Sequence, residues 1–420
     1  MAEKILVCTV GGSADPLITA IRQTRPSRVV FVCSDGENSS RSKVEGEDGI
    51  AVAAGLGPGK WKIVEIPVDD PDAGFARIRN ELVKLRKKLP TATVVADYTG
   101  GSKSMSVALA MAALATQAAI QLTTGCRPDL VKVEKGTERP VKVGFETVFA
   151  EFTLVRAAEA WNRFAYGDAS VWLDRLYRDL TLSEEVSTPS QHLKRRVGQL
   201  ANASMMFESW DRFDHHEAKY LFREHQLDQL PGLKAYGRAL QLLTSENREP
   251  LILLDLWHNA QRRAARGRFD DALARLYRLV EWSAQYVLRT ERGIETARFD
   301  PSILPQGKLR KQLEARFQEG NQTVRIGLVD SLLALRSLLP EHPLAASLTT
   351  RFAGEIPLQR LQQWIERRNR SILAHGFVPV DRDLWGEAEG WMKAHWLSWL
   401  QGELRGKGQD LPQFPTSFPA

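Results

Sequence analysis

Residues 97–104 form a short polar segment whose side chains could hold a phosphate-bearing ligand. In order they are Asp97, Tyr98, Thr99, Gly100, Gly101, Ser102, Lys103 and Ser104. An apolar run at 93–96 precedes the segment, and a helix of small residues is predicted to follow it. The two glycines allow a ligand to approach the backbone closely, the free amides at a helix start favour an anion, and Lys103 adds a cation. The pattern therefore predicts an anion-binding loop.

The class of ligand follows in part from what this loop lacks. A Walker-type phosphate loop needs a glycine directly before its lysine, and Ser102 stands there instead. A nucleoside triphosphatase is therefore not favoured. The loop suits a nucleotide or a phosphodiester, held by backbone amides, by the hydroxyls of Ser and Thr, and by one lysine.

Further polar residues are expected on the same rim of the predicted domain. Gly11, Gly12 and Ser13 follow the first apolar run, and Ser34 ends the second. In an open α/β sheet, ligands bind beyond the carboxyl ends of the strands, where the strand order reverses. The glycines could instead serve only to make tight turns, but two such loops on one rim favour a ligand site.

A second set of reactive groups lies in the segment 361–376. Its apolar residues recur at helical spacing, so we expect a helix from Leu361 to His375, closed by Gly376. One face of this helix carries Leu361, Ile365, Arg368, Ile372 and His375. An arginine and a histidine on a packing face must be paired, or must line a cleft in which a substrate supplies the partner. Because no acidic residue of the helix lies on this face, we favour the cleft over a purely structural histidine.

These groups suit the cleavage of RNA without a metal ion. The reaction needs a group that takes the proton from a ribose 2′-OH, a group that protonates the leaving 5′ oxygen, and a cation for the phosphorane. His375 could transfer protons, Arg368 could bind the phosphate bidentately, and Asn369 adjoins them. One histidine performs one proton step at a time, so a second copy of the helix from a paired subunit would be useful.

Two kinds of secondary structure are expected to position these residues. Runs rich in Val and Ile alternate with helical stretches up to residue 150, which predicts an α/β domain of the Rossmann type with a parallel sheet. A hairpin of two runs, 131–135 and 141–148, is expected to close the sheet edge. The predicted strands before it are 5–10, 28–33, 61–68, 93–98 and 120–124.

Beyond residue 152 the pattern is helical almost to the end, with breaks at 187–190 and 246–250. We therefore expect three domains, an α/β domain at 1–150, an all-α linker at 151–248 and an all-α domain at 249–420. The proline-rich residues 410–420 are expected to form a loose tail.

The composition is that of an ordinary globular protein. The 420 residues are 43% hydrophobic and carry a net charge of +6, a mild excess that permits a nucleic-acid partner without requiring one. The three cysteines, and His215, His216 and His258, lack metal-ligand spacing, so no metal or cofactor is expected and these histidines are assigned to the surface. The first strand begins too early for a signal peptide, and no apolar stretch suits a membrane span. A cytoplasmic protein without a membrane partner is expected.

The two segments together resemble a known family, the CRISPR-associated Rossmann-fold (CARF) proteins coupled to a HEPN ribonuclease domain, which are ancillary effectors of type III CRISPR systems. Residues 97–105 resemble the CARF loop after the fourth strand, and Gly11-Gly12-Ser13 resembles the loop after the first. Arg368-Asn369 followed by His375 is similar to the HEPN signature. The order of these features, with helices between them, is more specific than any one alone.

The resemblance implies a ligand-activated ribonuclease. Two CARF domains would pair and bind a cyclic oligoadenylate, which would activate cleavage of single-stranded RNA, at low sequence specificity, by a composite HEPN site of a homodimer. Arg368, Asn369 and His375 would be catalytic. The ligand would contact Gly11, Gly12, Ser13, Ser34, Thr99, Gly100, Gly101, Ser102, Lys103 and Ser104. The residues do not fix the ring size, and cyclic tetra-adenylate is favoured over cyclic hexa-adenylate.

Other function classes stay open at this point. The helical half could bind DNA, as in a ligand-controlled transcription regulator. The CARF domain could also degrade the cyclic oligoadenylate, because Ser and Thr hydroxyls could orient a 2′-OH for attack. A metal-dependent nuclease is disfavoured, since the helical half offers no set of carboxylates and a lysine on strands.

A basic run near residue 262 lies outside the resemblance. Arg262, Arg263, Arg266 and Arg268 precede an amphipathic helix predicted at 270–288. A solvated basic face is the simpler interpretation, and guidance of RNA toward the cleft is the alternative. Whether Glu281 or Arg278 on this helix supports the active site is left open.

Overall fold

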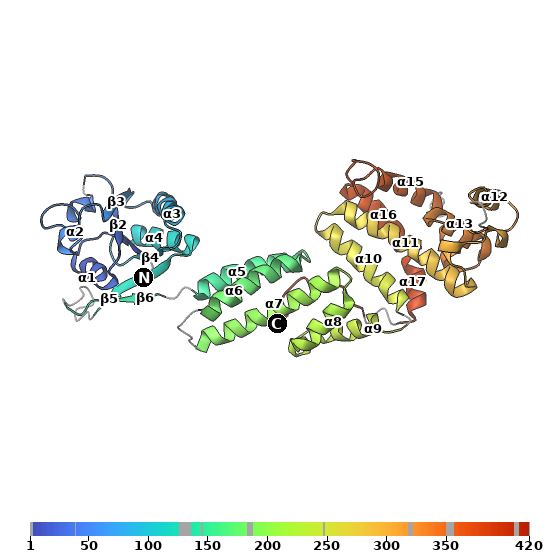
Figure 1. Ribbon diagram of the computed structural model, residues 1–420, viewed down its shortest axis with the longest axis horizontal. Coiled ribbons are helices and arrows are strands. Elements are labelled where there is room, and N and C mark those ends of the chain that lie inside the picture. The colour runs from blue at the N-terminus through green and yellow to red at the C-terminus, as the bar shows by residue number, and fades with distance from the viewer. Residues whose placement is uncertain are drawn as a thin grey trace. The chain divides into compact units, whose positions relative to one another are not determined.

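The computed structural model describes residues 3–37, 39–125, 136–143, 146–182, 188–246, 248–317, 322–349, 357–406 and 411–419. The chain divides into two compact units, Met1–Glu151 and Phe152–Ala420. The first contains a sheet and the second is built from helices (Figure 1). The predicted division into three domains stays a prediction.

The first unit is an α/β domain around one six-stranded sheet, as predicted. The strands are β1 (Lys4–Thr9), β2 (Arg28–Ser34), β3 (Trp61–Ile66), β4 (Thr93–Asp97), β5 (Ala119–Thr124) and β6 (Arg139–Lys142). They lie in the order β3-β2-β1-β4-β5-β6, and all neighbouring pairs are parallel except β5 with β6. The strand order reverses between β1 and β4, which places the switch point of the sheet between the two predicted ligand loops.

Helices cover both faces of this sheet. Helices α3 (Pro71–Lys88) and α4 (Lys103–Thr116) lie on one face, with Ile78 and Leu109 buried against Val7 and its neighbours. On the other face, α1 (Asp15–Thr24) and α2 (Ile50–Ala53) bury Leu17 and Ile50 against Leu6 and its neighbours. Alternate residues of β1 thus serve two apolar layers, which explains why the strands read as continuous apolar runs.

The predicted edge hairpin is correct only in part. Strand β6 pairs antiparallel with β5 at the sheet edge, whereas residues 131–135 lie outside the described part of the chain. The second run was predicted to extend to residue 148, which is wrong because α5 (Glu146–Asn162) begins there. Val148 lies inside this helix, whose Glu and Ala residues are strong helix formers.

The second unit is all-α, as predicted. After α5 come α6 (Tyr166–Leu182), α7 (Thr188–Asp211), α8 (His215–Glu224), α9 (Lys234–Leu243), α10 (Glu249–Ala265), α11 (Phe269–Arg292), α12 (Lys308–Glu314), α13 (Leu328–Leu338), α14 (Pro343–Thr349), α15 (Pro357–Asn369), α16 (Arg382–His395) and α17 (Leu397–Leu404). Helix α11 packs against α10, α15 and α16 (Figure 1). None of the described helices is long and apolar enough to cross a bilayer.

The segment 411–419 is part of the core, so the prediction of a loose tail is wrong. The Phe414 ring is 3% exposed and contacts the rings of Phe207 and Trp210. The hydroxyl of Tyr236 donates to the carbonyl of Gln413 at 2.9 Å. Prolines make the backbone of this segment extended, and its aromatic side chains fill a space between helices of the second unit.

The basic run is only in part the solvated face that the sequence suggested, since Arg268 is exposed but two of the other arginines are buried. Arg262 is fully buried, and Arg263 is 9% exposed. Nε of Arg262 and Nη2 of Arg263 lie 2.8 and 2.9 Å from the two carboxylate oxygens of Asp211, and the Arg262 guanidinium stacks 3.7 Å above the Phe414 ring. These two arginines are therefore occupied inside the protein and cannot guide RNA.

Two of the histidines differ from their predicted surface position. His215 is buried, and its Nε2 lies 2.8 Å from Oδ2 of Asp255, which also accepts a hydrogen bond from Trp210. Burial lowers the pKa of His258 to about 4, with Arg262 adding to the effect and Asp255 opposing it. His216 is exposed, as predicted.

Candidate functional site

The first candidate site lies at the switch point of the sheet. Strands β1 and β4 are neighbours, with Cys8 paired to Asp97, so the loops that follow them leave the sheet side by side. The hydroxyl of Thr9 donates to the carbonyl of Gly100 at 2.6 Å. The predicted meeting of these two loops on one rim is therefore correct.

The glycines allow the two loops to contact each other. A Cβ at Gly100 would lie 2.4 Å from the backbone oxygen of Thr9, and one at Gly11 would lie 2.5 Å from the nitrogen of Gly101. Gly101 also has a φ of +86°, a conformation that side chains disfavour. The first role of these glycines is thus to let the two loops pack against each other. Their contact with a ligand stays a prediction.

A buried carboxylate supports the loop from below. Asp97 is fully buried and accepts hydrogen bonds from the amide of Thr99 at 3.0 Å and from Gln121 Nε2 at 2.8 Å. The Thr99 hydroxyl donates to Asp97 and accepts from the amide of Thr123 at 2.7 Å. This hydroxyl is already used inside the protein, so Thr99 orients the loop. The supporting role of Asp97 could have been inferred from the sequence, because Asp97 is a charged residue at the end of an apolar strand.

Ser102 starts helix α4 as its N-cap. Its hydroxyl accepts from the amide of Met105 at 3.2 Å and donates to the carbonyl of Val68 at 2.7 Å. The exposed Lys103 and half-buried Ser104 follow as the first residues of the helix. Within the described residues, neither side chain has a partner inside the protein. These two are the groups of the loop with the most freedom to reach a ligand.

The loop after β2 contributes a residue that the sequence analysis missed. Ser34 and Ser40 bond each other through side chain and backbone, at 3.1 and 3.0 Å. This contact places Lys43, which donates to the carbonyl of Gly12 at 2.9 Å. Ser34 itself is 7% exposed and holds the loop, whereas the exposed Lys43 adds a cation near Gly12 and Ser13. The run of serines and basic residues at 39–43 is the sequence feature that could have revealed Lys43.

The second candidate site is formed at the end of α15, and the predicted helix to His375 is too long. The helix ends at Asn369, and the chain then turns back on itself. The amides of His375 and Gly376 donate to the carbonyls of Asn369 and Ser371, at 3.1 and 3.2 Å. A Cβ at Gly376 would lie 2.1 Å from the oxygen of Arg370. Glycine is therefore what allows this tight turn, which the helical periodicity alone did not reveal.

The turn separates the residues that were predicted to share one face. Leu361 and Ile365 are buried, whereas Ile372 is 68% exposed and His375 is exposed. Arg368 lies between these extremes, half-buried at the last turn of the helix. His375 thus follows Arg368 in a turn, and its side chain is open to an incoming group.

Arg368 is held by two contacts. Its guanidinium carbon lies 4.5 Å from the centroid of the Tyr277 ring on α11, and its Nη1 donates to Oδ1 of Asn369 at 3.2 Å. Its Nε is buried without a hydrogen-bond partner among the described residues. Burial, and next the charge of Glu281, raise the pKa of Tyr277, while Arg368 opposes this shift. The sequence analysis did not foresee this contact between Tyr277 and Arg368.

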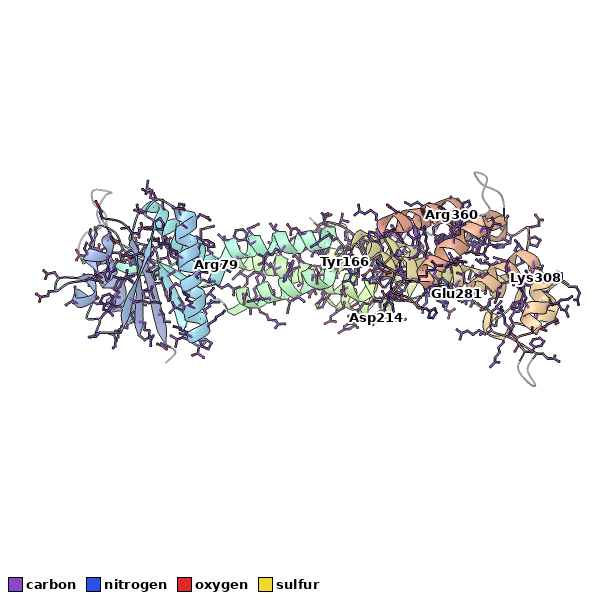
Figure 2. The ribbon with its side chains drawn as sticks, turned by 90° about the horizontal axis from the view of Figure 1, so that it is seen from above. Arg79, Tyr166, Asp214, Glu281, Lys308 and Arg360 are labelled. Carbon is purple, nitrogen blue, oxygen red and sulfur yellow. The ribbon has the colours of Figure 1, made fainter. Side chains whose placement is uncertain are left out.

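Arg278 and Glu281, which were considered as possible supports of the active site, are paired with each other. Nη1 of Arg278 donates to Glu281 at 2.8 Å. Glu281 on α11 and Arg360 on α15 both lie in the second unit (Figure 2). No group of three or more His, Cys, Asp or Glu residues that could hold a metal occurs among the residues that the structure describes.

Several apolar residues near His375 in the sequence are exposed. Phe377 is 92% exposed, Val378 is 59% exposed and Leu373 is 47% exposed. Together with Ile372 they form an apolar patch that we call the 372–378 patch. Beyond it the chain returns to the core at Val380, whose amide donates to Asp270 on α11 at 3.3 Å. An exposed patch of this kind marks a contact surface.

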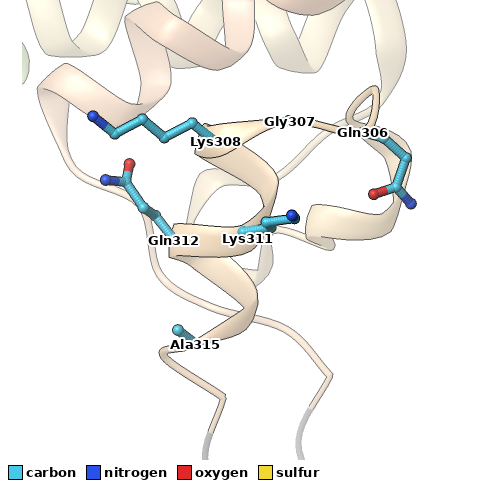
Figure 3. Close-up of a pocket in the computed structure, with 6 residues that line it drawn as sticks. All are labelled: Gln306, Gly307, Lys308, Lys311, Gln312 and Ala315. Atoms are coloured by element: carbon cyan, nitrogen blue, oxygen red, sulfur yellow. The ribbon is translucent and has the colours of Figure 1, made fainter.

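Two pockets of the second unit involve basic residues other than Arg368. One of about 300 Å³ lies between α15 and α16, with Arg360, Arg367 and Arg370 in its lining. The other, of about 780 Å³, lies beside α12, where Lys308 and Gln312 extend toward one side of the helix and Lys311 toward the other (Figure 3). Gln306, Gly307 and Ala315 complete its lining. Neither pocket contains His375.

Comparisons with known proteins match the helical second unit to one family model and the whole chain to one solved structure. Residues 243–392 match the family model described as the Csm6 HEPN domain. The fold is similar to that of Enterococcus italicus Csm6 bound to cyclic hexa-2′-fluoro-hexa-dAMP, with a TM-score of 0.55, 12% sequence identity, and coverage of 98% of this chain and 100% of that chain. The predicted resemblance to CARF–HEPN proteins is confirmed in this sense.

A second solved structure resembles only part of the chain. Can2 from Sulfobacillus thermosulfidooxidans, in complex with cyclic tetra-adenylate, matches with 12% identity over 53% of this chain and 68% of that chain. Its TM-score of 0.24 is too low to support an argument about the fold. No curated protein matches this sequence.

Proposed function

We propose that this chain, which has the fold of the CARF–HEPN ancillary effectors of CRISPR systems, is an endoribonuclease activated by a cyclic oligoadenylate. The first unit would bind the activator at the rim formed by the loops after β1 and β4. The second would cleave single-stranded RNA, in the cytoplasm, with low sequence specificity. The observation that carries this proposal is the oriented guanidinium of Arg368 next to a turn that presents His375, within a matched HEPN domain.

The cleavage step requires no metal ion in this proposal. His375 would take the proton from a ribose 2′-OH, whose oxygen attacks the adjacent phosphorus, while Arg368 stabilises the charge on the phosphate oxygens. The 5′ oxygen would leave with a proton from a second acid. The products would be a 2′,3′-cyclic phosphate and a free 5′-OH, so no water is consumed.

The need for a second acid favours a homodimer. One His375 cannot act as base and acid in the same step, and a second copy of the turn would supply the other group. The 372–378 patch supports this pairing, because exposed apolar side chains beside His375 would be covered when two copies meet.

The activator would be bound mainly by side chains of the rim that are wholly or partly open to solvent. Lys103, Ser104 and Ser13 are the candidates, together with Lys43, which also donates to the Gly12 carbonyl, and with Gly12 as a place for close approach. We keep cyclic tetra-adenylate as the favoured ring. The structural neighbour that matches along its full length was bound to a cyclic analogue of six nucleotides. The experiment must therefore include the rings of four and of six adenylates.

The test is cleavage of a labelled RNA in EDTA, with and without cyclic tetra- or hexa-adenylate. We expect Arg368→Ala and His375→Ala each to lower the stimulated rate about 100-fold or more, since each removes a group from the reaction. Arg367→Ala and His216→Ala serve as matched controls, because these are exposed residues of the same types outside the motif.

Two results would contradict the proposal in different ways. Cleavage by the alanine variants at the wild-type rate would show that the site is wrong, and a DNA-binding regulator would become the better hypothesis. A rate that neither ring changes would show that the control is wrong. Degradation of the activator by the first unit can be followed in the same experiment, with labelled ring and the His375→Ala protein.

A further inference from the structure

The HEPN signature names an arginine but does not explain how its flexible side chain is kept in place. Arg368 stands at the last turn of α15, and the chain reverses direction directly after it. A free arginine side chain in such a position samples many rotamers, and fixing it costs conformational entropy. Whatever orients the guanidinium therefore contributes to the reaction.

Tyr277 lies where it can do this. It belongs to α11, which packs against α15, and its helical neighbours Leu273, Leu276 and Val280 are fully buried. Tyr277 itself is half-buried, so its ring leaves the core at the surface between the two helices. This placement fixes the ring, because the apolar face on which it stands cannot move independently.

Two contacts hold the guanidinium of Arg368. The Tyr277 ring lies 4.5 Å from the guanidinium carbon, and Asn369 Oδ1 accepts from Nη1 at 3.2 Å. The ring thus contacts the group over its face, and the asparagine contacts one of its terminal nitrogens. Since Nε is buried, the terminal nitrogens are the part of the group that remains for an outside anion.

A second arginine near an aromatic ring, Arg278, differs from Arg368 because its charge is paired. Arg278 lies 5.3 Å from the Trp282 ring, but it also donates to Glu281 at 2.8 Å. Its charge is therefore neutralised within the protein. Arg368 has no carboxylate within ion-pair distance among the described residues, so its charge is available to a substrate.

We propose that Tyr277 is a positioning residue for Arg368, holding the guanidinium so that its terminal N–H groups face an RNA phosphate. The inference rests on the proposed function and adds a residue that the HEPN signature does not contain. It is the aromatic face that acts, through attraction between a cation and the ring quadrupole. The phenol hydroxyl has no role in the reaction.

The first experiment compares three variants in stimulated RNA cleavage. Tyr277→Leu should lower kcat about tenfold with little change in KM, because the ring supports an interaction that is strongest in the transition state. Tyr277→Phe should keep the rate within about twofold, since the ring face remains. Tyr286→Leu is the matched control, because Tyr286 is also half-buried on α11 and contacts Glu403 instead of the motif.

A second measurement separates positioning from a general effect on the fold. At position 277, phenylalanine is compared with ring-fluorinated phenylalanines. These keep the shape of the ring and weaken the negative charge on its face. The rate should fall stepwise as fluorine atoms are added, while the unfolding temperature stays constant. This series keeps the test valid if Tyr277→Leu fails to fold.

The outcomes distinguish this inference from the proposed function. If Arg368→Ala is inactive but Tyr277→Leu and the fluorinated series cleave like the wild type, the inference is wrong and the function stands. If Arg368→Ala cleaves normally, the function itself is wrong. In a double-mutant cycle on the single-turnover cleavage rate, Tyr277→Leu should lower the rate only when Arg368 is present. An equal loss in the Arg368→Ala protein would overturn the inference.

Discussion

The two candidate sites hold their polar groups in opposite ways. At the rim of the sheet, Asp97, Thr99 and Ser102 are bonded to other parts of the first unit, and the loops after β1 and β4 contact each other through glycines. At the end of α15, Arg368 is held by Tyr277 and Asn369, and His375 stands exposed on a turn.

This difference suggests how binding and cleavage are divided. A loop with its internal bonds already made does not need to reorganise when a ligand arrives, so it is suited to recognition. The proposed homodimer would bring a second His375 to the other site, so control by the activator would act on the meeting of two copies.

The largest expected effect tests the rigidity of the rim. Gly100→Ala places a methyl group 2.4 Å from the Thr9 oxygen, so the two loops must separate. We expect loss of activation by either cyclic oligoadenylate, measured as RNA cleavage over a range of activator concentrations. Gly57→Ala, in the loop before β3, is the control, because no atom lies within 4 Å of its Cβ. Equal activation of both variants would show that the rim is not preformed.

The next prediction tests whether the cleavage site is incomplete in one chain. Phe377→Asp puts a charge into the 372–378 patch, where the native side chain is 92% exposed and supports no core. We expect unchanged thermal stability, a shift from dimer to monomer in light scattering, and a rate reduced about tenfold at equal concentration. Val171→Asp, at a site 66% exposed on α6, is the control. A stable, active monomer would remove the need for pairing.

A smaller effect is expected from the cations at the rim. Lys103→Ala and Lys43→Ala should each weaken binding of the activator about three- to tenfold, because each removes one charge beside a polyanion. Lys43→Ala also removes the hydrogen bond to the Gly12 carbonyl. Titration calorimetry would measure the affinity, with the exposed Lys87→Ala on α3 as control. Unchanged affinity for both variants would place the ligand elsewhere.

The smallest prediction concerns stability in the second unit. The pKa of His258 is lowered to about 4 in the folded protein, so the unfolded chain binds the proton more readily between about pH 6.5 and 4. Stability is therefore lost as the pH falls through this window, by about 1 kcal/mol near pH 5.5.

His258→Gln tests this origin directly. The variant should show a weaker dependence of its unfolding temperature on pH than the wild type. His216→Gln, at an exposed position, should follow the wild type. If all three proteins follow the same curve, another group causes the dependence.

The fold could be predicted from the sequence where local pattern and final structure agree. The strands around Leu6, Val30 and Val95 are buried on both faces, so their apolar runs were informative. The loop residues could be located because parallel strands end at one rim.

The errors have a common physical cause. The burial of Arg262 depends on Asp211, which is distant in sequence, and the end of α15 depends on a turn that folds back on the Arg370 carbonyl. Phe414 was misplaced for the same reason, since its partners lie on α7. Tertiary contacts of this kind override local periodicity and composition.

The place of residues 411–419 in the core makes Arg262 dependent on a segment that is distant in sequence. Phe414 covers Arg262, and Gln413 accepts a hydrogen bond from it at 2.8 Å. Removing this segment would leave a buried guanidinium without two of its contacts, so the second unit would lose stability.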